Sequence, residues 1–205
     1  PTALGELLLI ITGEHGIWGI DNEDITRALI ISRKRVQDAI ALLKKYIPAF
    51  ANSFISATGT LGVRETRRII GEYTLTKGDI LSCKHFNDVV ARGTIAPGPH
   101  TPDGGDLAQP ESEHTPPPLT WEIPLRCLIP QKIDSLMVAG RCISVEHAAH
   151  GGIRVMGACL ATGQAAGVTA ALASKQGITV RKVSASEVQS LLKEQGVDLS
   201  SYKKD

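Results

Sequence analysis

The chain has 205 residues, of which 22 are basic and 21 acidic, so its formal net charge is only +1. A length of this order is enough for one sizeable hydrophobic core, and 42% hydrophobic with 21% charged residues is ordinary for a soluble globular protein. The balanced charge provides no overall field that would attract nucleic acid or an anionic membrane, and we expect neither as a partner.

The first predicted element is a long helix over residues 22–46. Apolar residues recur there at helical spacing while lysines and arginines occupy the opposite face. Asp21 or Asn22 is a plausible N-cap, and Pro48 ends the pattern. We interpret this helix as scaffold.

Residues 53–58, 67–70 and 72–75 are β-branched or aromatic pieces broken by glycines and predict short strands. Asp79 to Leu81 predicts a short helical turn. Residues 97–118 then hold seven of the eleven prolines and almost nothing apolar, which predicts an exposed loop. We place a domain boundary after this loop and expect domains at 1–120 and 121–205.

Trp121 to Ile129 alternates like a strand, and Leu136 to Gly140 predicts a short buried strand. An alanine- and glycine-rich helix is expected from 154 to 175, with Gly177 as its stop, and a last helix from Ser184 or Ser186 to about Glu194. The expected fold is a mixed α/β architecture. A short sheet from the 53–75 and 121–140 strands would pack against the two long helices.

The chemically informative stretch lies between 136 and 172. A glycine ends a strand, a polar loop with Gly151 and Gly152 follows, and a helix of small residues begins. The first N–H groups of that helix have no intrahelical partners and carry partial positive charge, so they suit an anion or an electron-rich oxygen. A tight turn in which glycine only relieves crowding explains the pattern equally well.

Several segments, in this order, resemble the FAD-dependent oxidoreductase family, whose distant relatives include fumarate reductase and succinate dehydrogenase flavoprotein subunits. They are GVRETRRIIGEYTLTKGDIL (62–81), EIPLRCLIP (122–130), VAGRCIS (138–144), EHAAHGGIRVM (146–156) and ATGQAAG (161–167). The resemblance implies the C-terminal portion of a two-domain flavoprotein fold, with part of the substrate-side (cap) domain at 1–120, including the loop at 97–118, and the C-terminal portion of the FAD-binding domain at 121–205. It also implies hydride transfer between a small organic substrate and FAD.

The resemblance further implies which residues contact the cofactor. Gly140 would pass close to the ribityl and phosphate region. Arg141 stands where many flavoproteins carry an aspartate, and it could instead meet the pyrophosphate. Gly151 precedes the expected helix, and Arg154, Val155 and Met156 would direct backbone N–H groups at the flavin N1 and C2 carbonyl.

Four residues are candidates for catalysis. His147 and His150 are expected in the loop before the helix, where a histidine could remove a substrate proton. The alternatives are a hydrogen bond from each histidine to backbone and an HxxH metal site. Arg64 and Arg68 could clamp a substrate carboxylate, although a salt-bridged scaffold with Glu65 is equally plausible.

The GxGxxG turn on which FAD binding in this family rests does not occur in the sequence. We therefore expect this chain alone to bind FAD weakly or not at all, to need a separate nucleotide-binding half, and to self-associate through the surface that this half would cover. The alternative is a non-catalytic interaction module derived from such a flavoprotein. A histidine-dependent hydrolase or metal enzyme is a weaker alternative, because no GxSxG turn or HExxH helix is present.

The four cysteines form neither a CxxC pair nor a zinc-like spacing. We expect reduced thiols, a cytoplasmic location, no bound metal and no membrane-spanning segment.

Overall fold

The computed structural model of the chain describes residues 5–95 and 120–200. These residues form two compact units, one from residues 5–66 and the other from residues 67–95 and 120–200. The expected proline-rich loop at 97–118 lies outside the described residues. The domain boundary expected after residue 120 concerns a different division and stays a prediction.

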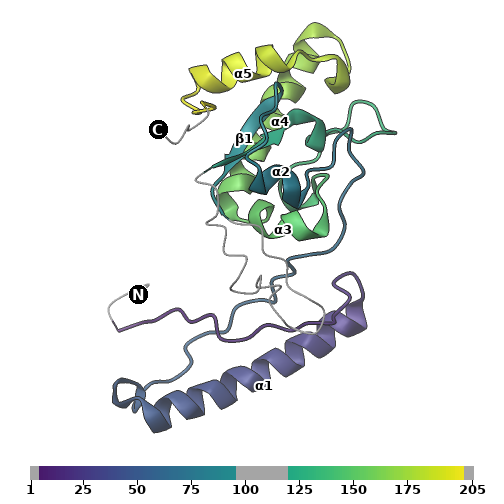
Figure 1. Cartoon of the computed structure of the whole chain (residues 1–205). Helices are drawn as coiled ribbons and strands as arrows, with labels where there is room; N and C mark the ends of the chain where they lie inside the picture. Colours follow the sequence, from purple (N-terminus) through teal and green to yellow (C-terminus); the bar gives the residue numbers. More distant parts are fainter. Residues whose placement is uncertain (1–4, 96–119, 201–205) are drawn as a thin grey trace. The chain divides into compact units, whose positions relative to one another are not determined.

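The first unit is built on α1, which spans Asn22–Tyr46. The Asp21 side chain caps it by accepting a hydrogen bond from the Asp24 N–H at 2.9 Å, and the helix ends one residue before Pro48 opens the short 3-10 helix η1 (Pro48–Phe50). Extended segments precede and follow α1, as Figure 1 shows. The prediction of this helix from its periodicity and caps is confirmed.

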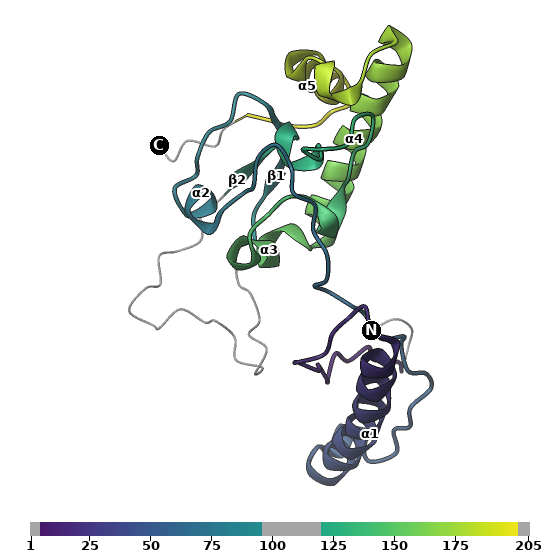
Figure 2. The same cartoon turned by 90° about the vertical axis from the view of Figure 1, so that its right-hand side faces the viewer.

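The second unit contains a two-stranded antiparallel sheet formed by β1 (Val89–Gly93) and β2 (Trp121–Pro124). Helices α4 (Met156–Gln176) and α5 (Ala185–Glu194) contact β1, while α2 (Lys77–Leu81) contacts β2 (Figures 1 and 2). The mixed α/β class is therefore confirmed, as are the last helix and the glycine stop of α4, where Gly177 adopts φ +66°.

The strands that make up the sheet differ from those expected. Residues 53–58 and 67–75 belong to no strand; the latter segment instead forms isolated bridges, from Gly71 to Pro130 and from Leu75 to Val145. Residues 136–140 are likewise not a strand, and the expected strand at Trp121 to Ile129 stops at Pro124, where η3 (Leu125–Leu128) begins. The pairing partner of β2 is β1, which the sequence interpretation missed.

Trp121 is the largest side chain in the core of the second unit and is 1% exposed. Its indole Nε1 donates to the Ile95 carbonyl at 3.0 Å. Gly93 and Gly152 both lie against the ring, since a Cβ built on them would come within 2.1 Å and 2.9 Å of Trp121 Cζ2. Gly152 belongs to α3 (His147–Ile153), so this ring joins the sheet to α3.

Buried charge next to the ring is paired. Glu122 is 6% exposed, and its carboxylate accepts hydrogen bonds from Arg92 at 2.8 Å and from the Phe86 N–H at 2.8 Å. A buried carboxylate is tolerated only with such partners. The pair therefore fixes β1 and the segment before it to β2.

Candidate functional site

The candidate site begins at the short 3-10 turn η4 (Gly140–Cys142). Gly140 adopts φ +72°, a backbone conformation that residues other than glycine rarely adopt. Its N–H donates to Thr162 Oγ1 at 3.0 Å, and a Cβ built on it would lie 3.6 Å from Cys159 Sγ. Thr162 and Cys159 both belong to α4, so η4 lies against the first two turns of that helix.

Two further contacts hold η4 in place. His150, 1% exposed on α3, has Nε2 at 2.8 Å from the Arg141 carbonyl oxygen. Because a carbonyl oxygen only accepts, Nε2 carries the proton in this bond. The Cys142 carbonyl accepts from the Ile69 N–H at 2.9 Å. The turn is thus fixed by α3, by α4 and by the chain around residue 69.

The junction between α3 and α4 differs from the expected glycine turn. Gly151 and Gly152 lie inside α3, and the chain turns at Arg154, the C-cap of α3, and Val155, the N-cap of α4. The glycine at 152 serves close packing within a helix, because the Trp121 ring and the Ile95 carbonyl occupy the place of a Cβ. The prediction that His147 and His150 lie in a loop is therefore wrong, because both residues belong to α3.

The N-terminus of α4 presents unused hydrogen-bond donors. No side chain caps it, and within the described chain no acceptor is found for the N–H groups of Met156, Gly157 and Ala158. Met156 is 83% exposed, and a Cβ on Gly157 would meet nothing within 4 Å. This helix end is therefore open to an approaching ligand on the side of Gly157.

The electrostatic character of this end is positive. A helix of 21 residues places partial positive charge at its N-terminus, and no acidic residue lies in the first turn of α4. Burial raises the pKa of the Cys159 thiol, while the positive charge of Arg141 acts in the opposite direction, which brings Arg141 within electrostatic range of the first turn. Such an end suits phosphate or an electron-rich ring oxygen, so the residues present fit the edge of a flavin nucleotide.

The structure places the other predicted residues as follows. His147 is exposed as the first residue of α3. Arg68 is half-buried beside Ile69, the residue that bonds η4, and among the described residues it has no ion pair or hydrogen bond. Arg64 is exposed and belongs to the first unit. The structure thus brings together Gly140, Arg141, His150 and the 154–156 junction, with Arg68 on a neighbouring segment.

The sequence interpretation missed the role of Thr162. It lies within the ATGQAAG segment, but its contact with Gly140 spans 22 residues and leaves no local signal. It also missed that Trp121 reaches α3 through Gly152. Arg126 pairs with Asp88 at 2.9 Å and lies over the Tyr73 ring.

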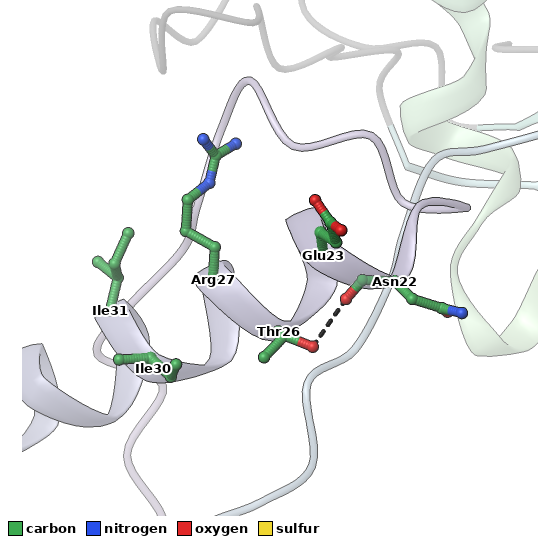
Figure 3. A pocket seen from close by; sticks show the side chains of 6 residues that line it. All are labelled: Asn22, Glu23, Thr26, Arg27, Ile30 and Ile31. Atoms are coloured by element: carbon green, nitrogen blue, oxygen red, sulfur yellow. Dashed lines mark hydrogen bonds between the residues drawn. The ribbon is translucent and has the colours of Figure 1, made fainter.

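An open pocket of 470 Å³ lies elsewhere, over the first turns of α1 (Figure 3). Thr26 Oγ1 bonds the Asn22 carbonyl at its floor at 2.7 Å. This pocket contains none of the predicted site residues, so we assign the site to η4 and α4. Its lining is Asn22, Glu23, Thr26, Arg27, Ile30 and Ile31.

Across residues 5–95 and 120–200, no three His, Cys, Asp or Glu side chains gather as metal ligands, and all four cysteines are free. In the same residues α4 is the one helix with the length and apolar composition to cross a membrane, a criterion that core helices of soluble proteins also meet. Its buried face packs on the sheet, and the absence of a membrane span stays a prediction.

A family model described as FAD dependent oxidoreductase matches residues 8–192. No curated protein matches the chain, and no solved structure does. The match covers both compact units and includes η4, α3 and α4.

Proposed function

The chain belongs to the FAD dependent oxidoreductase family, and from this premise we propose that it contributes the flavin-contacting and substrate-side part of an enzyme that transfers hydride between a small organic substrate and FAD. The similarity to fumarate reductase and succinate dehydrogenase subunits, drawn from sequence segments, stays a prediction. FAD, when bound, accepts the hydride and gathers negative charge on its N1 and C2 carbonyl region.

The observation that carries this proposal is the uncapped start of α4 beside the Gly140 turn. The N–H groups of Met156, Gly157 and Ala158 supply fixed dipoles where that negative charge would be held. Because the donors are held by the helix itself, little reorganisation would be needed when charge develops. Arg154 and Val155 set the direction of this helix start, and Arg141 adds positive charge next to it.

Roles for the remaining residues follow from their surroundings. His147, exposed at the start of α3, is the better placed of the two histidines to exchange a proton with a substrate, because His150 is buried against the Arg141 carbonyl. Arg68 supplies a half-buried guanidinium without a described partner beside η4, which suits a substrate carboxylate. The carboxylate-binding role expected of Arg64 from its sequence segment stays a prediction, since Arg64 belongs to the first unit.

A nucleotide-binding half is part of the proposal. The sequence has no GxGxxG turn to hold the pyrophosphate, so the cofactor needs contacts from another polypeptide segment. The start of the first unit supports the proposal that a further segment packs against this chain. Leu8 and Ile10 are 74% and 85% exposed, and residues 7–12 have no backbone hydrogen bond in the described chain. An extended apolar segment with free main-chain groups is suited to pairing with a further strand.

Retention of flavin tests the proposal. This chain mixed with FAD and desalted is expected to retain less than stoichiometric flavin. If the coding sequence extends upstream in frame and encodes a GxGxxG unit, the longer polypeptide expressed from it is expected to purify yellow. A colourless protein from that longer coding sequence would contradict the proposal.

A matched pair of variants locates the cofactor. Gly157→Asp adds a carboxylate at the open helix start and should expel the flavin, while the fold tolerates it because nothing lies within 4 Å of that Cβ and an acid in the first turn favours the helix. Gly163→Asp makes the same change at an equally open position two turns later and should leave flavin binding intact. Equal flavin content in both variants would place the cofactor elsewhere.

The alternative is a non-catalytic interaction module, which the exposed apolar segment near Leu8 would favour. This reading predicts a stable complex with a partner protein and no flavin in the longer polypeptide. Both proposals expect a cytoplasmic protein whose isolated chain self-associates. Gel filtration therefore does not distinguish the two proposals, whereas the flavin content of the longer polypeptide does.

A further inference from the structure

Two buried threonines on α4 bond their own helix in a similar way, although Thr162 Oγ1 also lies 3.1 Å from the Cys159 carbonyl oxygen. Thr162 and Thr169 are both 0% exposed, and each hydroxyl donates to the carbonyl four residues earlier, Ala158 and Ala165, at 2.8 Å. A hydroxyl can donate one hydrogen bond and still accept others. In the described chain only Thr162 uses this capacity to bind another element, accepting the Gly140 N–H at 3.0 Å.

The contact joins the two halves of the candidate site. Gly140 begins η4 with a left-handed φ of +72°, and Thr162 lies in the second turn of α4, directly behind the open N–H groups of Met156 to Ala158. The opposite side of η4 is held by His150 through the Arg141 carbonyl. With both bonds in place, the turn and the helix start cannot shift independently.

We propose that Thr162 is a positioning residue of the flavin site, whose hydroxyl fixes the Gly140 turn relative to the N-terminus of α4 so that one cofactor can contact both. This inference rests on the proposed function. The inference goes beyond that function, because it assigns the geometry of the site to a side chain that does not itself contact the cofactor. Sites in which supporting hydrogen bonds lock the contacting groups bind more tightly than sites without them.

Three variants isolate the hydroxyl. Thr162→Val removes it with little change in volume, Thr162→Ser keeps it, and Thr169→Val removes the equivalent buried hydroxyl that has no contact with η4. In this chain without flavin, amide hydrogen exchange at Gly140 should become about two- to tenfold faster in Thr162→Val, the range that loss of one net hydrogen bond supports. Thr162→Ser should restore slow exchange, and Thr169→Val should leave it unchanged.

The flavin is measured in the polypeptide that supplies the nucleotide-binding unit. Thr162→Val should release flavin faster than the wild type by a factor of the same order, while Thr169→Val and Thr162→Ser should not. If Thr162→Val and Thr169→Val hold flavin equally well, or if Gly140 exchange does not respond to Thr162→Val, the inference is wrong. A wild-type protein without flavin but with a Thr162-dependent Gly140 amide would instead refute the proposed function.

Discussion

Replacing Gly93 with alanine tests whether the Trp121 ring organises the second unit. The new Cβ would come 2.1 Å from Trp121 Cζ2 and 2.4 Å from both Cε2 and Cη2, whereas ordinary contact begins near 3.4 Å. The ring cannot retreat easily, because Gly152 and the Ile95 carbonyl occupy its surroundings and the residue is 1% exposed.

The cost follows from this geometry. Overpacking of a well-filled core costs about 1–3 kcal/mol, and displacement of the indole from Ile95 would sacrifice a hydrogen bond of about 0.5–1.5 kcal/mol. The lower backbone entropy of unfolded alanine returns about 0.5–1 kcal/mol. We therefore expect Gly93→Ala to lower the free energy of unfolding by about 2 kcal/mol, the centre of a sum that runs from about 0.5 to about 4 kcal/mol.

Urea unfolding followed by tryptophan fluorescence measures this effect. The chain has two tryptophans, and Trp18 is 67% exposed in the first unit, so a Trp18→Phe background leaves Trp121 as the reporter. Gly163→Ala is the control, because its Cβ meets nothing within 4 Å. In a second test, with unfolding followed by far-UV circular dichroism because no reporter tryptophan remains, Trp121→Phe removes the ring atoms that the new methyl group would meet, so the Gly93→Ala/Trp121→Phe variant should lose less than the sum of the single losses. An unchanged midpoint for Gly93→Ala, with native Trp121 emission, would refute the packing argument.

Four other outcomes are expected. Gly167→Ala should raise the free energy of unfolding by about 0.5–1 kcal/mol, because its Cβ meets open space in mid-helix; a lower urea midpoint would contradict this. Burial raises the pKa of the Cys127 thiol to about 12, so it should resist alkylation in the native protein while exposed Cys83 reacts. Since the unfolded thiol ionises near its ordinary pKa of 9.0, stability should fall as pH rises above that value, and Cys127→Ala should lack this component of the slope. Burial alone would raise the pKa of Asp79, but hydrogen bonds, first from the Thr76 N–H, hold it below its ordinary 3.8. Its stabilising contribution is therefore complete above that value and lost as pH falls through the lowered pKa, and Asp79→Asn should remove this part of the acid sensitivity seen in pH-dependent unfolding.

The helices were predictable where periodicity and end signals agree. In α1 the apolar spacing, the Asp21 cap and Pro48 define one element without reference to the rest of the chain. The end of α4 was equally clear, because Gly177 takes the left-handed conformation that stops a helix. Both signals are local, and local signals survive without knowledge of tertiary contacts.

The sheet and α3 were not predictable for the opposite reason. Residues 67–75 have strand composition, but their backbone bonds go to irregular segments around Pro130 and Cys142, so composition identified an extended chain without its partner. The Gly151-Gly152 pair indicates a loop by propensity alone. It is helical here because a ring from residue 121 packs where side chains would otherwise project.

The sequence named residues for the candidate site but not their arrangement. Residue 140 lies against the start of α4, while the cofactor contacts that the family resemblance implied for residues 140, 141 and 154–156 stay a prediction. The contacts that hold the Gly140 turn are made by His150 and Thr162, through hydrogen bonds to residues 9 and 22 positions away in the sequence. Long-range bonds of this kind have no periodic signature in a single sequence.

The pairing of Gly93 with Trp121 has a consequence for how this protein can vary. Ladder bonds and the indole contact keep Ile95 and Thr120 near one another regardless of the stretch that joins them. Each doubling of such a connection costs only about 0.6 kcal/mol in closure entropy. Relatives should therefore differ freely in the length of this connection, and a reporter sequence inserted there should leave the rest of the second unit intact.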